Sequence, residues 1–153
     1  MPELFDIIDT NSIELINNIR ANMGSAGINA THDTEKSLRR EITQEATKIR
    51  FQLFGRPFFM SIETGRRPTP DKKPSREMIN RIKGWAAARN MDENAAWAIA
   101  TSIQKKGTEL WREGGRKDLV SSPIGKFLND TSTQLLDALA EDFAINIQQQ
   151  WSQ

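Results

Sequence analysis

The chain has 153 residues, with 21 basic and 20 acidic side chains and a formal net charge of +1, a length that suits one folded domain over residues 1–153. It contains no cysteine, which excludes a disulfide scaffold, a thiolate zinc site and a cysteine nucleophile. Seven Phe and four Trp residues argue against a disordered chain. No apolar run is long enough to span a bilayer. We therefore expect a protein of the cytosol, or of an assembly built there, that does not contact a membrane.

Charge is distributed unevenly along the chain. The two end segments, 1–19 and 127–153, each contain four acidic residues and no basic one. The stretch from Gly65 to Arg89 contains eight basic and two acidic residues, a net charge of +6. Acidic ends and a basic middle suit subunits that meet the opposite charge on a neighbour. The alternative is a set of solvated faces that contact nothing.

The first half of the chain predicts a helix followed by a β-hairpin. Apolar residues recur at helical spacing over 11–23. Residues 35–46 are highly charged and suit either the end of a helix or the start of a strand. Apolar and polar residues alternate over 47–53, which is typical of a half-buried strand. A short apolar stretch at 58–62 is expected to pair with that strand, so that the hairpin covers about 46–62.

The second half predicts three helices. One covers about 75–90, with a serine in the N-cap position. The next covers 92–106 and ends at Gly107, after two lysines that suit the negative end of the helix dipole. The last covers 124–151, and its apolar stripe contains Leu128, Leu135, Leu136, Leu139, Phe143, Ile147 and Trp151. Together these elements predict an α+β fold, a small antiparallel hairpin packed with about four helices and carrying extended loops or arms.

Residues suited to catalysis or metal binding are sparse. The only histidine is His32, which lies in a Gly-rich loop where a solvated side chain is expected. One histidine without cysteine supplies neither a His-based triad nor a zinc site. The segment GRKDLVSSPIGK lacks the spacing and the preceding strand of a phosphate-binding loop. We therefore expect no enzyme, no metal and no cofactor.

The segment TGRRPTPDKKP forms a basic loop at 63–74. Its three prolines hold the backbone extended and remove hydrogen-bond donors, so it cannot lie inside a sheet. The basic residues could neutralise nucleic-acid phosphates or meet acidic groups of a partner, and the alternative is a solvated loop. The candidate docking or DNA-facing residues of this loop are Glu63, Gly65, Arg66, Arg67, Lys72, Lys73 and Arg76.

A second candidate surface lies in the connector TELWREGGRKDLVSSP, residues 108–123. Connectors of this length are often functional. Trp111 could insert into a pocket of a neighbouring subunit as an interface anchor, or it could fold back onto the core of its own chain. The candidate interface residues of this connector are Trp111, Arg112, Arg116 and Lys117.

Four motifs follow one another from about Glu63 to Asp118: ETGRRPTP, INRIKGWAAARNM, AAWAIATSIQKKGT and REGGRKD. Their order resembles the tail-completion and head–tail joining proteins at the neck of tailed bacteriophages. Those proteins typically show an acid-x-Gly-Arg-(Arg/Lys)-Pro turn, a helix with a central Trp, and an alanine-rich helix that ends in Gly-Thr.

The resemblance implies a structural virion protein without catalytic activity. Its copies would form a homo-oligomeric ring in the neck or tail, in contact with portal or adaptor proteins and with tail or neck proteins. Genomic DNA would pass through the lumen without sequence-specific contacts, and the particle would be assembled in the host cytoplasm. Two alternatives remain open: a small nucleic-acid-binding protein that uses the basic loop, and an assembly factor that never enters the particle.

Overall fold

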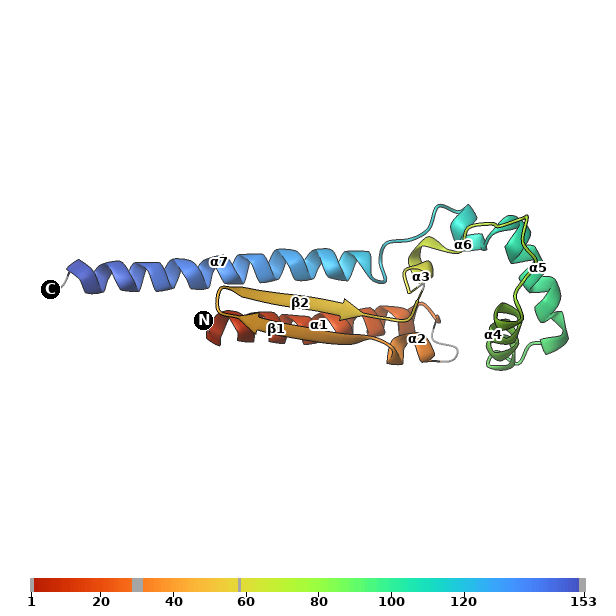
Figure 1. Ribbon diagram of the computed structural model, residues 1–153, viewed down its shortest axis with the longest axis horizontal. Coiled ribbons are helices and arrows are strands. Elements are labelled where there is room, and N and C mark those ends of the chain that lie inside the picture. Colours follow the sequence, from red (N-terminus) through yellow and green to blue (C-terminus); the bar gives the residue numbers. More distant parts are fainter. Residues whose placement is uncertain (1, 29–31, 58, 152–153) are drawn as a thin grey trace.

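The computed structural model describes residues 2–28, 32–57 and 59–151, and it confirms the α+β fold (Figure 1). The molecule is elongated and has two parts. We call residues 65–118 the helical lobe, and the remaining described residues the arm. In chain order the elements are α1 (Pro2–Ser25), α2 (Asp33–Lys36), β1 (Arg39–Glu45), β2 (Lys48–Phe54), α3 (Ser61–Thr64), α4 (Arg76–Ala87), a 3-10 turn (Glu93–Ala95), α5 (Ala96–Lys106), α6 (Glu109–Arg112) and α7 (Ser121–Trp151).

The hairpin differs from the one expected from the sequence. Strand β2 is present, but its antiparallel partner is the preceding strand β1, with Arg39 opposite Phe54 and Glu45 opposite Lys48. Of the segment expected to be the second strand, residues 59–62 form a turn and the start of α3, whereas Phe58 lies outside the described residues. The reason is packing, because a helical turn here lets Phe59 and Ile62 contact the hydrophobic core.

Helix α1 is longer than the expected segment 11–23, since it covers Pro2–Ser25. Proline is well tolerated in the first turn of a helix, where its missing N–H would have no partner. Helix α7 likewise starts three residues before the expected position 124. The N-terminal half of α7 packs along α1, where Asn11 Nδ2 donates to Thr131 Oγ1 at 3.1 Å and Lys126 Nζ lies 3.1 Å from Glu14 Oε1.

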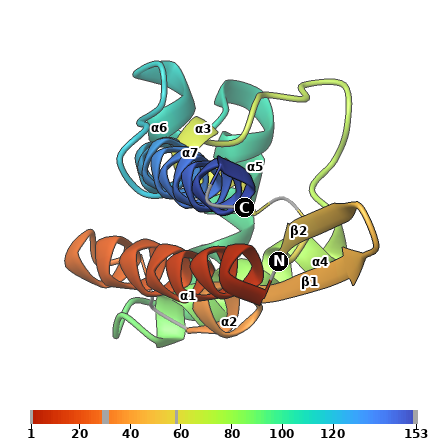
Figure 2. The same ribbon diagram turned by 90° about the vertical axis from the view of Figure 1, so that its left-hand side faces the viewer.

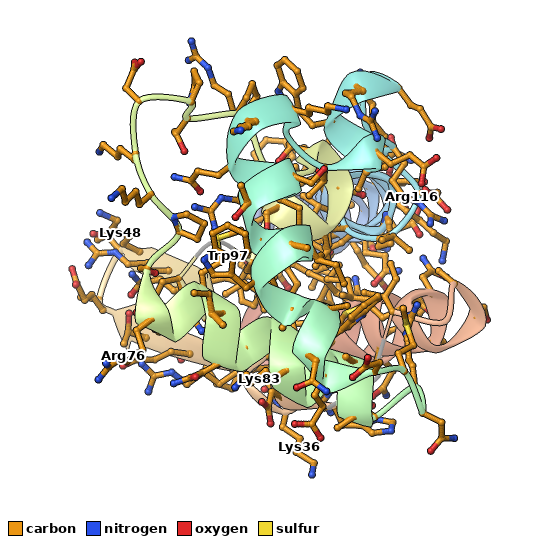
Figure 3. All side chains as sticks on the ribbon, turned by 90° about the vertical axis from the view of Figure 1, so that its right-hand side faces the viewer. Lys36, Lys48, Arg76, Lys83, Trp97 and Arg116 are labelled. Carbon is orange, nitrogen blue, oxygen red and sulfur yellow. The ribbon has the colours of Figure 1, made fainter. Side chains whose placement is uncertain are left out.

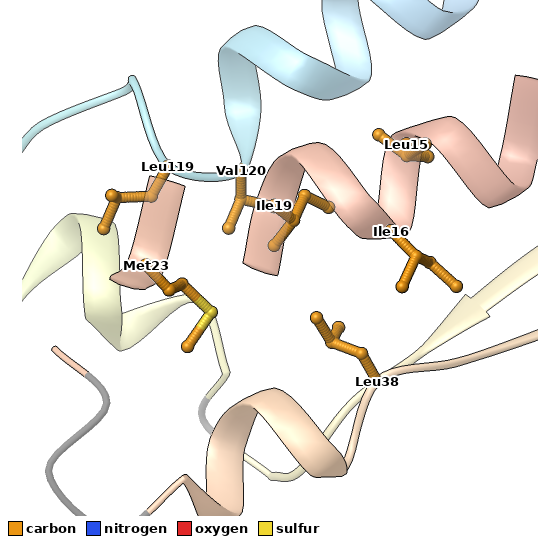
Figure 4. Packing of buried hydrophobic residues seen from close by; sticks show 7 residues of the cluster. All are labelled: Leu15, Ile16, Ile19, Met23, Leu38, Leu119 and Val120. Carbon is orange, nitrogen blue, oxygen red and sulfur yellow. The ribbon is translucent and has the colours of Figure 1, made fainter. Parts of the chain in front are cut away.

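The hydrophobic core lies where α1, the hairpin and the start of α7 meet (Figure 4). Ile19 and Met23 of α1 are fully buried, and the Phe51 ring of β2 lies 5.0 Å from the Phe127 ring of α7. Each such aliphatic side chain contributes about 1.5–3 kcal/mol by leaving water. The buried members of this core are Leu15, Ile16, Ile19, Met23, Leu38, Leu119 and Val120.

The helical lobe contains α4, the 3-10 turn, α5 and α6. Helix α4 begins after Ser75, whose hydroxyl accepts the Met78 N–H at 3.1 Å, and α5 ends at Gly107. These positions agree closely with the helices expected over 75–90 and 92–106. Ala86 of α4 is fully buried, as are Ala96 and Ala100 of α5, so small side chains let the two helices pack closely.

The C-terminal half of α7 extends past the hairpin turn and past the start of α1 (Figure 1). Viewed from that end, α7 lies over α1, with the hairpin beside α1 (Figure 2). The helical lobe lies at the opposite end of the long axis. The tip of α7 and the helical lobe are therefore far apart within one chain.

Candidate docking surfaces

Hydrogen bonds from backbone N–H groups join the basic loop to the connector and to the end of α5, and we call this unit the clasp (residues 63–69 and 104–116). The bonds run from Arg66 N to Thr108 Oγ1 (2.8 Å), from Thr108 N to the Arg66 carbonyl (3.0 Å), from Thr69 N to the Gln104 carbonyl (2.8 Å) and from Arg116 N to the Glu63 carbonyl (2.8 Å). The clasp thus brings together the first and the last of the motifs that carry the family resemblance. It also holds the start of the proline-rich loop in one shape.

Two glycines allow the two segments of the clasp to come into contact. Gly65 has a φ of +68°, and a Cβ there would lie 2.4 Å from Trp111 N. Gly107 has a φ of +74°, and a Cβ there would lie 2.8 Å from the Arg66 carbonyl oxygen. Side chains do not fit at either position, and L-residues rarely adopt this backbone conformation. Gly65 therefore serves contact within the chain.

Glu63 is buried, with 1% of its surface exposed, and it caps the N-terminus of α7. Its Oε1 accepts hydrogen bonds from the backbone N–H groups of Leu119 (2.9 Å), Val120 (2.7 Å) and Ser121 (3.0 Å). Its Oε2 accepts a bond from the Ser121 hydroxyl. The sequence placed Glu63 on a docking loop, whereas its side chain is enclosed between α3 and α7 and cannot meet a partner.

The environment of Glu63 keeps its carboxylate ionised. Burial raises the pKa of this group, but the hydrogen bonds from the Ser121 hydroxyl and from the three backbone N–H groups outweigh that effect, and the net result is a lowered pKa. The positive end of the α7 dipole favours the same charged form. A charged, fully bonded carboxylate therefore fixes the direction in which α7 leaves the helical lobe.

Arg66 is likewise used within the chain. Its Nη2 donates to the side-chain oxygen of Gln104 at 3.1 Å, and its Nη1 lies 3.1 Å from the sulfur of Met78. Gln104 and Met78 are both buried, on α5 and α4 respectively. Arg66 thus ties the clasp to both main helices of the lobe, which corrects the expectation that this guanidinium faces a partner.

The other basic residues of the loop have exposed side chains. Within the described residues, the side chains of Arg67, Lys72, Lys73 and Arg76 make no ion pair or hydrogen bond. Arg76 is seen at the edge of the lobe in Figure 3. Of the seven residues proposed for this loop, these four present charge that an external partner could use.

The connector residues divide in a similar way. Trp111 is 40% exposed and packs beside Gly107 in the clasp, so it folds back onto its own chain in part. Arg116 Nε donates to Asp118 Oδ1 at 2.7 Å, and the hydrogen bonds from this guanidinium lower the pKa of Asp118 to about 2. The side chains of Arg112 and Lys117 are exposed and form no ion pair within the described part of the chain.

A further apolar surface lies on α7. We call Leu128, Leu136, Leu139, Phe143 and Ile147 the outer face; all five side chains are exposed, Leu136 and Phe143 by 66% and 67%. At 3.6 residues per turn they lie within an arc of about 100° that contains no charged residue of α7. The sequence correctly showed an apolar stripe here, but it did not show that these residues face away from α1.

A cleft separates the helical lobe from the base of the arm, with a volume of about 560 Å³. We call it the interlobe cleft. Ion pairs lie along it, between Asp33 and Arg56 (3.2 Å) and between Glu77 and Arg81 (2.6 Å). Its apolar and small lining residues are Ile28, Pro57, Phe59, Ile62, Gly84 and Trp85. This cleft was not predicted, because its walls come from segments far apart in the chain.

Side chains typical of metal binding do not form a cluster in the described part of the chain. His32 is exposed and lies 3.0 Å from Glu35, as expected for a solvated loop. Among residues 2–28, 32–57 and 59–151, no cluster of three or more His, Cys, Asp or Glu side chains could hold a metal ion. No helix there is long and apolar enough to cross a membrane.

Comparisons with family models, with curated proteins and with solved structures find no match to this chain.

Proposed function

We propose that this chain is a structural, non-enzymatic subunit of a tailed-phage virion, and that its copies form a ring in the neck or tail. The ring would connect portal or adaptor proteins to tail proteins, with genomic DNA in its lumen. Two observations support the proposal: the motif order over Glu63–Asp118, and surfaces suited to assembly at both ends of the molecule.

The observation that carries the proposal is the outer face of α7. Five large apolar side chains are exposed along a helix whose C-terminal half extends beyond the rest of the chain. Contiguous exposed apolar surface usually marks a site of protein–protein contact. Burying each of these side chains would contribute about 1.5–3 kcal/mol to an assembly. A helix of this kind suits a subunit that is completed by its neighbours.

The clasp supports the same interpretation from the other end. It fixes the start of the basic loop, and the prolines stiffen the remainder. A loop that is ordered before it binds loses less conformational entropy on contact. The loop can therefore offer Arg67, Lys72 and Lys73 to an acidic subunit, or to DNA in the lumen, at little ordering cost.

The test is quantitative mass spectrometry of purified, DNA-filled particles, counting this chain against the portal subunit. A fixed count on the order of ten copies per particle is expected for one closed ring with cyclic symmetry. Tailless heads from the same preparation provide the reference for a neck component. Absence of the chain from mature particles would overturn the proposal and would favour an assembly factor.

A nucleic-acid-binding function is the second candidate, and it is favoured by the four unpaired cations Arg67, Lys72, Lys73 and Arg76. Phosphate contacts make binding strongly salt-dependent, with a slope of about −0.9 in log affinity against log salt for each contact. Titration of duplex DNA at several salt concentrations measures that slope. A slope of about −3 to −4 with tight binding, together with absence from particles, would replace the virion proposal.

A further inference from the structure

Opposite charges lie at opposite ends of the long axis. From residue 127 onward, the chain contains four acidic residues and no basic one, whereas the helical lobe contains thirteen basic and seven acidic residues. The tip of α7 and the lobe are far apart in Figure 1. Because α7 is one continuous helix of 31 residues, it cannot fold back onto its own lobe. A contact between these surfaces must therefore join two molecules.

The charges at both ends are available for such a contact. Asp137, Glu141 and Asp142 form no ion pair within the described residues. Asp142 lies next to the outer face, whereas Asp137 and Glu141 lie on the other side of α7 and contribute only to its overall negative charge. At the other end, Arg76 and Lys83 of α4 are exposed and likewise unpaired in the described part of the chain, and both are visible in Figure 3. They do not line the interlobe cleft, whose own charged residues form ion pairs, so they act on a partner from beside it. Complementary potentials of this kind steer two surfaces toward each other and set their orientation.

Both surfaces also carry apolar side chains. The outer face of α7 is a convex apolar ridge, and the interlobe cleft is a concave site lined by Phe59, Ile62 and Trp85. Gly84, in the middle of α4, lines this cleft, and a Cβ there would meet nothing within 4 Å. An interior glycine weakens a helix relative to alanine, and no contact within the chain requires one here. A glycine at this position leaves room for a partner to approach α4 closely.

We propose that the outer face of α7 binds in the interlobe cleft of a second copy of this chain. The contact uses different surfaces on the two copies, so it is head-to-tail, and repeating it produces either a closed ring or a filament. This inference rests on the proposed ring function and deepens it, since it names the two surfaces that meet.

The absence of cysteine allows a direct test by disulfide trapping. One preparation of the full chain carries Phe143→Cys and another carries Gly84→Cys; both positions are exposed, so both variants should fold. A disulfide needs Cα atoms within about 7 Å of each other. After equimolar mixing and oxidation, we expect a mixed dimer as the main product. The matched control replaces Phe143→Cys with Glu141→Cys, which lies on the opposite side of α7, and should give a much lower yield.

Two outcomes would overturn the inference. If Phe143→Cys alone forms disulfide dimers as efficiently as the mixture, then α7 helices pack against each other and not into the cleft. If the mixture gives no more product than the control, both in concentrated solution and in assembled particles, the surfaces do not meet. Asp142→Lys, next to the outer face, should lower the yield of mixed dimer by roughly twofold to fivefold at low salt, whereas Glu141→Lys, on the opposite side of α7, should change it little.

Failure of the inference can be told apart from failure of the proposed function. Particles that contain the chain but give no disulfide between positions 143 and 84 would retain the virion role and remove this contact. A chain that is absent from particles but forms the mixed dimer in solution would retain the contact and remove the virion role.

Discussion

The arm and the helical lobe are stabilised by different kinds of contact. In the arm, large aliphatic side chains such as Ile19 and Met23 fill the space between α1, the hairpin and α7. In the lobe, Ala96 and Ala100 are buried, and the clasp joins backbone to backbone. This difference implies that the stability of the arm should be sensitive to lost side-chain volume, whereas the stability of the lobe should be sensitive to added side-chain volume. Substitutions that remove or add a few atoms can therefore test each part separately.

The largest effect is expected in the arm. Ile19→Ala leaves a cavity in a fully buried position and should lower the free energy of unfolding by about 2–5 kcal/mol. Urea denaturation measures this. Ile13→Ala, on an exposed part of the same helix, is the matched control and should change stability by less than about 0.5 kcal/mol. Similar losses in both variants would mean that the core of the arm is not packed as described.

Adding side-chain volume in the clasp should lower the stability of the protein. Gly65→Ala places a Cβ 2.4 Å from Trp111 N in a backbone region that favours glycine, and should cost about 2 kcal/mol or more. Gly84→Ala is the control, and its effect on stability should have the opposite sign. The added Cβ meets no atom within 4 Å, so the substitution should stabilise the isolated chain by about 0.5–1 kcal/mol. Thermal unfolding compares the two. If Gly65→Ala stabilises the protein, the two segments of the clasp do not lie as close together as described.

The joint between α3 and α7, which Glu63 makes next to the helical lobe, should respond to pH. The pKa of Glu63 is lowered from 4.5 in the folded protein. The ionised group therefore contributes stability above about pH 4.5, and this contribution is lost as the pH falls through the lowered folded value. Glu63→Gln keeps the shape but removes the charge, and should cost about 1–3 kcal/mol at neutral pH.

Free energies of unfolding measured from pH 7 to pH 3 test this joint. The variant should show a flatter pH dependence than the unsubstituted chain. Asp137→Asn serves as the control, because Asp137 is exposed and forms no ion pair within the described residues, so the pH dependence should stay that of the unsubstituted chain. An unchanged pH profile in Glu63→Gln would show that the carboxylate does not act as the cap of α7.

The smallest effect on stability is expected at Arg67. Arg67→Glu should change the free energy of unfolding by less than about 0.5 kcal/mol and yet reduce the yield of complete particles, because this side chain is exposed and unpaired in the described part of the chain. Arg66→Glu should instead lower stability, since it removes the bond to Gln104. Normal particle yield from Arg67→Glu would exclude this residue from docking.

Local sequence signals predicted the main helices of the helical lobe well. Ser75 caps α4 and Gly107 ends α5, and both signals lie within one turn of the helix end that they define. A strand was only one of two alternatives for residues 35–46, because Ile42 is the only apolar residue of β1 and its alternation is hardly visible in the sequence. Pairing with β2 therefore had to be learned from the structure.

The candidate sites were harder to predict, because their residues act over long distances in the sequence. Glu63 was predicted as a docking residue, which is wrong, because its carboxylate binds residues 119–121, more than fifty positions away in the sequence. The periodicity of α7 showed that the helix is amphipathic. The periodicity did not show which apolar side chains of α7 would meet α1. The orientation of α7 on α1 depends on contacts between the two helices, such as those made by Asn11 and Lys126.

The cap at Glu63 has a mechanical consequence. Helix α7 has 31 residues, so at 1.5 Å per residue it acts as a lever about 46 Å long. A tilt of about ten degrees at its capped end moves the far tip by about 8 Å, well over one helical turn. The cap at Glu63 and the packing of the N-terminal half of α7 on α1 therefore together set the direction of this helix, and with it the curvature of any ring that the proposed assembly forms.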